Sequence, residues 1–301
     1  MTTLAQHPTA AVTRTDAAGV FGWSAAYERL AQGVNDAIAA VSPAATSAVT
    51  YPPVIPRSTI VRAEYLAAFP QLVGSVSTWR GTPASMGQLL ATADTGPEWG
   101  PEMTASDVVL SPAVCYHLYP SYADSRLDAP AVADVRGFCF RAEATAELGR
   151  FRSFRMRELV GIGTRDWCAG QHTAWLALVT DLLTSFGLAP SIDPASDPFF
   201  GPGRRLLAAA QRDNGFKLEF RVPLEPDGPL TAIASVNQHA DHLGTRFAIS
   251  TADATPAHSL CAAFGIDRIV LALLHTHGED TAAWPATVLR ALHLEHDHAD
   301  H

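Results

Sequence analysis

The sequence predicts an α+β fold in which helices pack beside an antiparallel sheet. Segments with the apolar and β-branched pattern of strands follow one another through hairpin-like polar loops rather than through crossover helices. Longer segments have the apolar period of amphipathic helices. The 301-residue chain has 48% hydrophobic and 17% charged residues, so it is able to bury a large core, as one large domain or as two small ones.

The predicted helices are the four segments with apolar residues at helical spacing. They are residues 17–40, 59–69, 167–186 and 264–275. The second helix stops before Pro70, because a proline disfavours helical geometry in the residue that precedes it. The third ends at Gly187, since glycine is a common residue just past a helix C-terminus.

The predicted strands are six segments rich in β-branched and apolar residues. They are residues 108–118, which end in a turn, 135–143, 154–162, 216–222, 231–236 and 245–250. Residues 1–15 are expected to form a loose tail. Residues 42–56 are rich in Pro, Ser, Thr and Ala, and are expected to be a linker.

The composition excludes several classes of function. A net charge of −9 argues against extensive contact with tRNA or DNA, whose partners usually present a basic face. Neither G-x-G-x-x-G nor G-x-x-x-x-G-K-[ST] occurs. No apolar run of 18 residues predicts a membrane helix and no signal peptide opens the chain, so the cytoplasm is the expected compartment. The four cysteines form no C-x-x-C pair and are core residues or metal ligands.

The densest functional pattern lies between Phe140 and Glu158, where five arginines are clustered. In strand geometry Phe154, Met156 and Glu158 point to one face, and Arg155 and Arg157 to the other. Charged residues on a half-buried strand need partners or a ligand. The alternative is a solvated charged hairpin, because charge runs usually lie on the surface.

A nucleoside triphosphate would satisfy these side chains. Arg141 presents a planar fork to the α-phosphate, where charge develops when a carboxylate attacks. Glu143 is a candidate to accept a hydrogen bond from the adenine amino group. Arg150, in the loop, is a candidate to contact the outer phosphates. Phe154 is a candidate stacking partner for adenine. Arg268 follows a strand and a glycine at the start of a helix, so we expect it to contact phosphate, with a surface Asp267–Arg268 pair as the alternative.

Together these segments resemble motifs 2 and 3 of the class II aminoacyl-tRNA synthetases. The narrower resemblance is to the amino acid:[carrier protein] ligases, truncated relatives of the atypical zinc-dependent seryl-tRNA synthetases. It runs from about Tyr51 to Leu292. The matching segments are 52–56, 111–116, 140–143, 153–158, 197–201, 217–219, 235–239 and 258–268.

The resemblance implies a class II synthetase-like antiparallel sheet flanked by helices, and a homodimer. It places a catalytic domain at residues 51–292, after an N-terminal tail and helix at 1–50. Residues 293–301 contain four histidines and are expected to be a solvated tail.

A zinc ion is also implied by the resemblance, which assigns its ligands to Cys115, Glu158 and Cys261. Three protein ligands leave one tetrahedral position open, which the amine of an amino acid would fill. From the spacing alone, both cysteines would be interpreted as buried core thiols. The resemblance further assigns the substrate side to residues with polar side chains on two strands. They are Lys217, Glu219 and Asn237.

The implied reaction is the ATP- and Mg²⁺-dependent activation of a small amino acid to an aminoacyl-adenylate. Glycine or alanine is the expected substrate, and the acceptor is the phosphopantetheine thiol of a carrier protein. About 50 residues precede the matching region, too few for the tRNA-binding domain of a seryl-tRNA synthetase, so no tRNA partner is expected. Arg204 and Arg205 are candidates for a local basic surface facing the carrier. A tRNA-charging enzyme and a non-catalytic synthetase paralogue are the alternatives.

Overall fold

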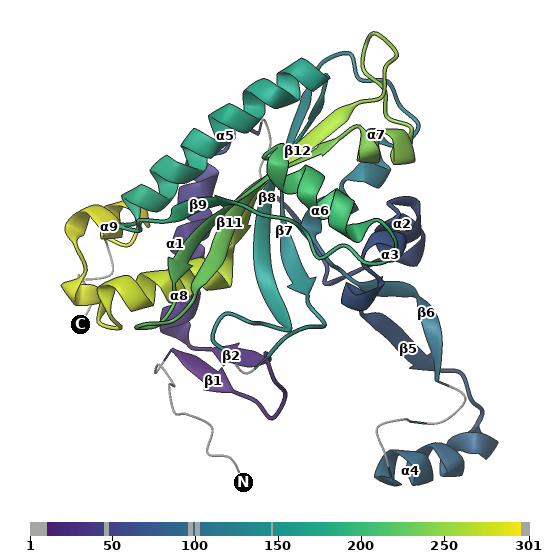
Figure 1. Ribbon diagram of the computed structural model, residues 1–301. Coiled ribbons are helices and arrows are strands. Elements are labelled where there is room, and N and C mark those ends of the chain that lie inside the picture. Colours follow the sequence, from purple (N-terminus) through teal and green to yellow (C-terminus); the bar gives the residue numbers. More distant parts are fainter. Residues whose placement is uncertain (1–10, 45–47, 96–98, 100–102, 146, 296–301) are drawn as a thin grey trace.

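The computed structural model describes residues 11–295, apart from 45–47, 96–98, 100–102 and 146. Its central feature is a seven-stranded sheet in the order β3-β7-β8-β12-β11-β10-β9 (Figure 1). All neighbouring strands pair antiparallel except β3 and β7, which are parallel. The strands are β3 (Val49–Tyr51), β7 (Ala131–Phe140), β8 (Ser153–Gly163), β9 (Ser191–Pro194), β10 (Lys217–Pro223), β11 (Leu230–Ala240) and β12 (His258–Gly265). The predicted α+β fold is confirmed.

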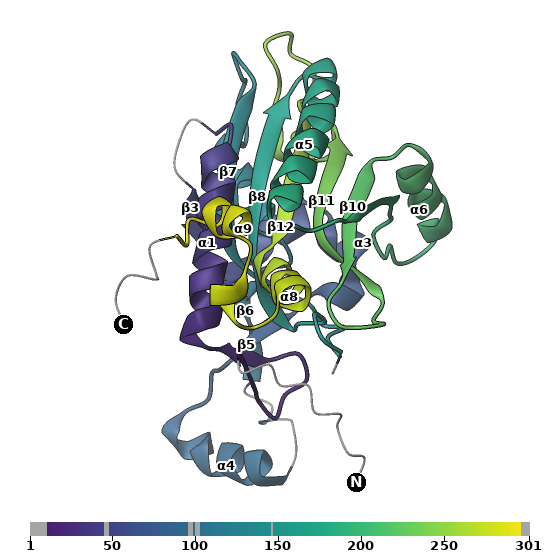
Figure 2. The ribbon, with the colours of Figure 1, turned by 90° about the vertical axis from the view of Figure 1, so that its left-hand side faces the viewer.

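Three long helices cover one face of this sheet (Figure 2). They are α1 (Ala25–Val41), α5 (Arg165–Ser185) and α8 (Ile266–His277). The first two begin at a capping residue, since Ser24 and Thr164 each accept a hydrogen bond from a backbone N–H three residues further on. The short helix α9 (Ala286–Ala291) packs at the end of α5. The main hydrophobic core lies between these helices and the sheet.

Shorter elements lie against the opposite face and the edges of the sheet. They are the 3₁₀ helices η3 (Val114–His117) and η4 (Tyr119–Tyr122) and the helices α6 (Arg204–Asp213) and α7 (His242–Phe247). The 3₁₀ turn η5 (Thr281–Ala283) instead lies in the connection between α8 and α9. The N-terminal hairpin pairs β1 (Val12–Arg14) with β2 (Phe21–Trp23). The face next to η3 is therefore the one left open for a site.

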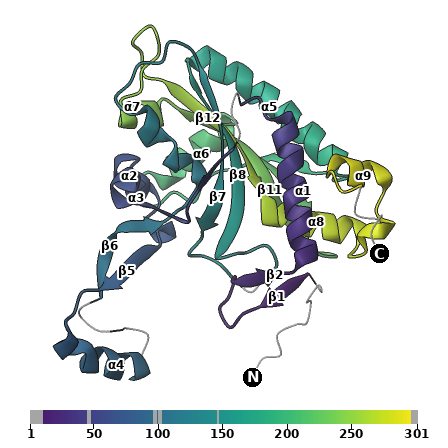
Figure 3. The same ribbon diagram turned by 180° about the vertical axis from the view of Figure 1, so that it is seen from behind.

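A second, three-stranded sheet projects from the body in the order β4-β6-β5 (Figure 3). Its elements and those that accompany it are β4 (Val54–Pro56), α2 (Arg57–Arg62), α3 (Tyr65–Ala68), η1 (Pro70–Leu72), β5 (Ser75–Trp79), η2 (Pro83–Ser85), α4 (Met86–Thr95) and β6 (Met103–Leu110). No helix in the described part of the chain is long and apolar enough to cross a membrane.

Several predicted elements are wrong in kind. Residues 42–56 are no simple linker, because they contain β3 and β4. Residues 245–250 do not form a strand, since helix α7 ends within them and Phe247 packs in the core. The predicted helix 59–69 is two short helices, separated where Glu64 adopts a left-handed conformation at φ 57°.

Other predicted elements differ mainly in their bounds. The hairpin of residues 135–143 and 154–162 is confirmed as β7 and β8. The predicted helix 264–275 begins later, because Phe264 and Gly265 complete strand β12. The predicted tail 1–15 contains β1. The predicted helix 17–40 begins only at Ala25, because β2 occupies part of its first residues. Of the C-terminal tail, residues 296–301 lie outside the described residues.

Candidate active site

The open face of the sheet carries a group of arginines around one aromatic ring. Arg141 follows β7 directly, and its Nη1 donates hydrogen bonds to the carbonyl oxygens of Pro112 and, at 2.8 Å, of Phe140. Its guanidinium lies 5.4 Å from the centre of the Phe154 ring. Arg268, in the first turn of α8, lies 5.6 Å from the centre of the same ring. Phe154 is only 4% exposed.

Arg268 is held by backbone oxygens rather than by a carboxylate. Its Nε donates to Gly149 O and its Nη1 to Ala232 O, both at 2.9 Å. Burial, with the nearby positive charges of Arg141 and Arg150 adding to its effect, lowers the pKa of Arg268 to about 10. Within the described part of the chain, no ion pair joins Arg141 or Arg268 to an acidic side chain. Three cations therefore converge where an anion would relieve their repulsion.

Two of these arginines, Arg141 and Arg268, border a cavity of about 120 Å³ that also reaches strand β10. Its polar lining includes Lys217 and Glu219. The Lys217 Nζ lies 2.6 Å from Asp197 Oδ1 and 3.3 Å from Glu219 Oε1, and Arg221 pairs with Glu219 at 2.6 Å. Lys217 and Glu219 thus sit side by side at the cavity, as their spacing on one strand predicts.

The two loop residues proposed for ATP are more exposed. Arg150 pairs with Glu147 at 3.5 Å, and both side chains are more than half exposed. Glu143 is exposed, yet its negative charge is close enough to Arg268 to favour the charged form of the arginine. The structure therefore brings the predicted nucleotide residues to one region, with Arg141, Phe154 and Arg268 inside it and Glu143 and Arg150 at its edge.

A second group of buried side chains lies deeper on the same face. It contains Cys115 from η3, Glu158 from β8 and Cys261 from β12, with exposed fractions of 5%, 1% and 3%. A hydrogen bond with Cys261 raises the pKa of the Cys115 thiol, and the same bond lowers the pKa of Cys261. Burial, with the charge of Cys261 adding to it, raises the pKa of Glu158 to about 8. Ionising both Glu158 and Cys261 would crowd two negative charges together, which is why the carboxyl group holds its proton more tightly.

Asn237 and His239 from β11 complete this group. Asn237 Nδ2 donates to Cys261 Sγ at 3.3 Å and to Ser235 Oγ at 3.1 Å, while its buried Oδ1 has no hydrogen-bond partner among the described residues. His239 Nε2 lies 3.7 Å from Cys261 Sγ. Its Nδ1 lies 3.1 Å from Ser259 Oγ. Asn237 is therefore placed beside the thiols rather than beside the arginines.

The donor types of this group match zinc, which binds thiolates, imidazoles and carboxylates. Their spacing does not match. Across the residues that the structure describes, no three or more His, Cys, Asp or Glu side chains are arranged to hold a metal ion. One carboxylate oxygen of Glu158 is also engaged, because Oε1 accepts a hydrogen bond of 3.1 Å from the Val114 N–H.

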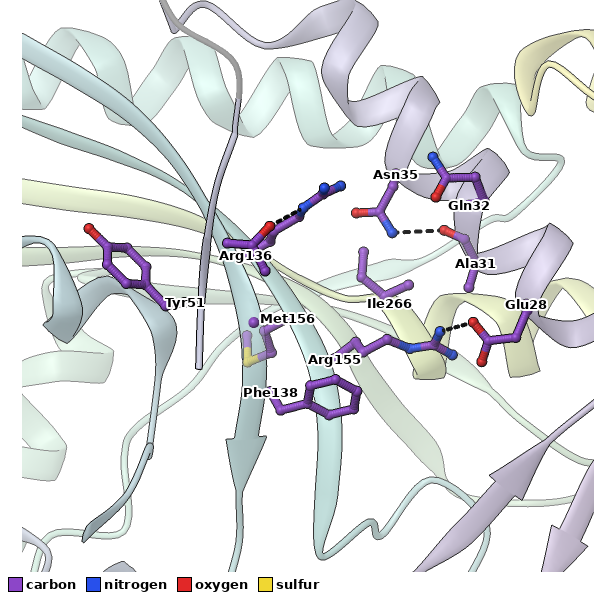
Figure 4. Close-up of a pocket in the computed structure, with 12 residues that line it drawn as sticks. Glu28, Ala31, Gln32, Asn35, Tyr51, Arg136, Phe138, Arg155, Met156 and Ile266 are labelled. Atoms are coloured by element: carbon purple, nitrogen blue, oxygen red, sulfur yellow. Dashed lines mark hydrogen bonds and ion pairs between the residues drawn. The ribbon is translucent and has the colours of Figure 1, made fainter. Parts of the chain in front are cut away.

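The helix-covered face holds two further arginines of the hairpin, Arg155 and Arg157. Arg155 contacts Asp267 of α8 and Glu28 of α1, at 2.5 and 2.6 Å. Arg157 forms a fully buried pair with Asp134 of the neighbouring strand at 2.6 Å. Figure 4 shows Arg155 extended toward Glu28 beside a cavity of about 260 Å³. These arginines have complete sets of partners, so they are structural.

Two residues near the site, Asp197 and His239, were not predicted from the sequence. Asp197 accepts hydrogen bonds from Lys217 at 2.6 Å and from Gln211 at 2.9 Å. Burial raises the pKa of Asp197, but the ammonium of Lys217 helps to keep this pKa below its ordinary value. Asp197 opens the segment 197–201, which matches the family that the sequence resembles. That match is the one signal that could have identified Asp197 as a site residue.

Comparison with known proteins gives two classes of relative. No protein-family model matches the chain. It is 39% identical over 279 residues to amino acid–[acyl-carrier-protein] ligase 2 of Bradyrhizobium diazoefficiens, which covers 92% of this chain and 83% of that protein. Ligase 1 of the same organism is 38% identical, with 92% and 86% covered. The type-2 serine–tRNA ligase of Methanopyrus kandleri is 25% identical over 61% of this chain and 37% of its own.

Solved structures agree on the fold. Seryl-tRNA synthetase of M. kandleri, crystallised in complex with A. aeolicus tRNASec, superposes with a TM-score of 0.78 at 20% identity, over 93% of this chain and 58% of that one. Seryl-tRNA synthetase of Pyrococcus horikoshii complexed with ATP superposes with a TM-score of 0.62 at 15% identity, over 87% and 54%. The synthetase-like sheet predicted from the sequence is thereby confirmed.

Proposed function

The chain belongs to the amino acid–[acyl-carrier-protein] ligases, and we propose that it activates an amino acid with ATP and transfers it to a carrier protein. The observation that carries the proposal for this site is the convergence of Arg141, Arg150 and Arg268 beside a cavity, with no carboxylate paired to Arg141 or Arg268 in the described part of the chain. Such a cluster suits the phosphates of ATP.

In the proposed first step the amino-acid carboxylate attacks the α-phosphorus of ATP. An aminoacyl-adenylate forms and pyrophosphate leaves. Arg141 stabilises the charge that develops on the α-phosphate, while Arg268 and the more exposed Arg150 hold the outgoing phosphates. Phe154 offers its ring to adenine and Glu143 its carboxylate to the adenine amino group, in the role we propose for each. Mg²⁺ would share the phosphate charge, as is usual for ATP.

In the second step a thiol attacks the carbonyl carbon of the adenylate. AMP leaves and a thioester forms. We propose that the thiol is the phosphopantetheine group of the carrier protein. Helix α6 bears exposed Arg204, Arg205 and Arg212, and we propose that this basic surface faces the carrier. Reversing the charges of Arg204 and Arg205 should weaken transfer without changing adenylate formation; equal transfer rates would exclude this surface.

The substrate side of the site suits a small amino acid, in our proposal glycine or alanine. Lys217 and Glu219 offer charges of both signs at the cavity, and the partnerless Oδ1 of Asn237 offers an acceptor to an ammonium or hydroxyl group. One methyl group changes discrimination by only about 1–3 kcal/mol, so the preference between glycine and alanine is expected to be modest.

We propose that Cys115, Glu158 and Cys261 hold a zinc ion, which would orient the amino acid through its amine. The resemblance, the donor types and the crowding of negative charge support this assignment, although the side chains would have to move to reach ligand distances. Cys261→Ser should lower the zinc content measured by mass spectrometry of the purified protein. Cys139→Ser is the matched control, since Cys139 is an equally buried thiol that the assignment leaves out. Full zinc content in the Cys261 variant would refute the ligand set.

We also propose that the chain forms a homodimer through the outer side of β3. This strand ends the sheet, and Val49, Val41 and Phe138 nearby are each more than 40% exposed. An open strand edge with apolar neighbours favours association. Light scattering after size exclusion should give twice the chain mass, and a Val49→Lys substitution should return it to one.

The decisive experiment is a screen of ATP–pyrophosphate exchange with each of the twenty amino acids. We expect exchange with one or a few small amino acids, followed by a carrier protein whose mass rises by one aminoacyl group. Charging of tRNA by the same preparation would favour the synthetase alternative. Absence of exchange with every amino acid would favour a non-catalytic paralogue.

A further inference from the structure

Residues 111–117 connect the two groups of the site, and we call them the bridging segment. The Pro112 carbonyl oxygen accepts a hydrogen bond from the guanidinium of Arg141. The Val114 N–H donates to Glu158 Oε1 at 3.1 Å. Cys115 belongs to the segment itself. The orientation of the phosphate-side arginine and of the thiol group therefore depends on one short stretch of backbone.

The segment is fastened at both ends. At its start, Ser111 N–H donates to Pro53 O at 2.9 Å, and Phe140 N–H donates to Ser111 O at 2.8 Å. At its end, His117 Nε2 lies 3.1 Å from Ser111 Oγ. Because the single hydroxyl hydrogen of Ser111 is directed to Ala113 O at 3.2 Å, the bond to His117 has Nε2–H as its donor. The segment is thus closed into a loop by its first and last side chains.

An aromatic stack ties this loop to the edge of the sheet. The Tyr51 ring lies parallel to the His117 ring, with centroids 4.7 Å apart and planes at 10°. Tyr51 ends β3 and pairs with Gly137 of β7. A Cβ at Gly137 would stand 2.6 Å from Tyr51 O, so glycine is what lets β3 seat this closely. Figure 4 shows the Tyr51 ring directed away from the α1 side chains at the other end of the 260 Å³ cavity.

We infer that Tyr51 and His117 are positioning residues for the reaction, acting through the bridging segment on Arg141, Glu158 and Cys115. Neither residue lines the cavity between Arg141 and Arg268. Their stack holds the loop in place, and the loop positions the side chains that we propose bind ATP and zinc. This inference rests on the proposed function, which identifies the substrates as ATP and an amino acid. The predicted effect on ATP binding, however, can be measured even if the protein activates no amino acid.

The test compares Tyr51→Leu with Tyr51→Phe in the full chain. We measure the ATP dissociation constant by calorimetry, the amino-acid KM in pyrophosphate exchange per active site, and the Tm. Tyr51→Leu removes the stack and should weaken ATP binding and raise the amino-acid KM by about tenfold each, because small displacements of binding groups are costly. Tyr51→Phe keeps the ring and should rescue both values.

Trp284→Leu is the control, since Trp284 contacts the His277 ring with centroids 5.2 Å apart, in a part of the chain outside the site. It should lower the Tm with no effect on either binding value. If Tyr51→Leu behaves like this control, the stack is only structural and the inference is wrong. Should Tyr51→Leu fail to fold, Ser111→Ala opens the loop instead and must weaken ATP binding at least threefold. Wild-type protein that binds ATP yet shows no exchange would reject the proposed function and leave the ATP comparison valid.

Discussion

Arginines occur on both faces of the central sheet, and the two faces treat them differently. On the helix-covered face, Arg155 and Arg157 meet the carboxylates of Asp267, Glu28 and Asp134. On the open face, Arg141 and Arg268 meet carbonyl oxygens and the ring of Phe154. A buried charge with a counterion is part of the fold, whereas cations gathered without one mark a place for an anionic ligand. The comparison predicts loss of stability on one face and loss of activity on the other.

The largest effect is expected from Arg157→Ala on the helix-covered face. It leaves Asp134 buried without its partner, which should lower the free energy of unfolding by about 3–5 kcal/mol. Urea denaturation measures it. Replacing both residues, with Arg157→Met and Asp134→Leu, should recover most of the loss. A loss below about 1 kcal/mol for the single variant would mean that the pair is not the structural element proposed here.

Arg141→Ala should give the reverse pattern. Pyrophosphate exchange is expected to fall by about 10²–10³-fold, the usual effect of removing one donor to a developing charge. The free energy of unfolding should fall by only about 1 kcal/mol, because hydrogen bonds to carbonyl oxygens are lost but no ion pair is broken. Exchange near the wild-type rate would remove Arg141 from the mechanism and break the comparison.

Glu28→Gln tests whether the helix-covered face is uniform. Glu28 is half exposed, and Arg155 keeps its buried partner Asp267 when Glu28 loses its charge. We therefore expect a loss of only about 0.2–1 kcal/mol in unfolding free energy. A much larger loss would show that the stability of this face depends on the α1 contact more than on the pair with α8.

Arg150→Ala should have the smallest effect. Its side chain is more than half exposed, and its one ion pair among the described residues, with Glu147, is long at 3.5 Å. We expect the KM for ATP to rise about two- to fivefold, as for one solvent-screened charge contact, with an unchanged Tm. Steady-state exchange at varied ATP concentration measures it. An effect as large as that of Arg141→Ala would place Arg150 inside the phosphate site.

The sequence predicted the parts of this fold that depend on local pattern. The alternation along 154–162 identified β8 and correctly placed Arg155 and Arg157 on the face opposite Glu158. The sequence pattern failed where tertiary packing decides the structure. Residues 245–250 have a strand-like composition, but burial of Phe247 in the core stabilises a helix there. A three-residue strand such as β3 leaves too short a pattern to detect within residues rich in proline and serine.

The site itself divides in the same way. Arg141 and Phe154 were predictable because they lie close together in one charged hairpin. The grouping of Cys115, Glu158 and Cys261 was implied only by the family resemblance, since the three residues come from distant parts of the chain. The loop closed by His117 and the role of Asp197 depend on side-chain contacts that no spacing encodes.

The order of the strands has a consequence for how the protein acquires activity. Strands β7 and β8 form one hairpin, and β10 and β11 another, but β8 and β12 pair across a long stretch of sequence. Glu158 and Cys261 lie on the two sides of this seam. Local hairpins form early, and pairings between distant segments form late because closing a long loop costs entropy. Recovery of exchange activity during refolding should therefore lag behind recovery of secondary structure, making catalysis a reporter of the last step of folding.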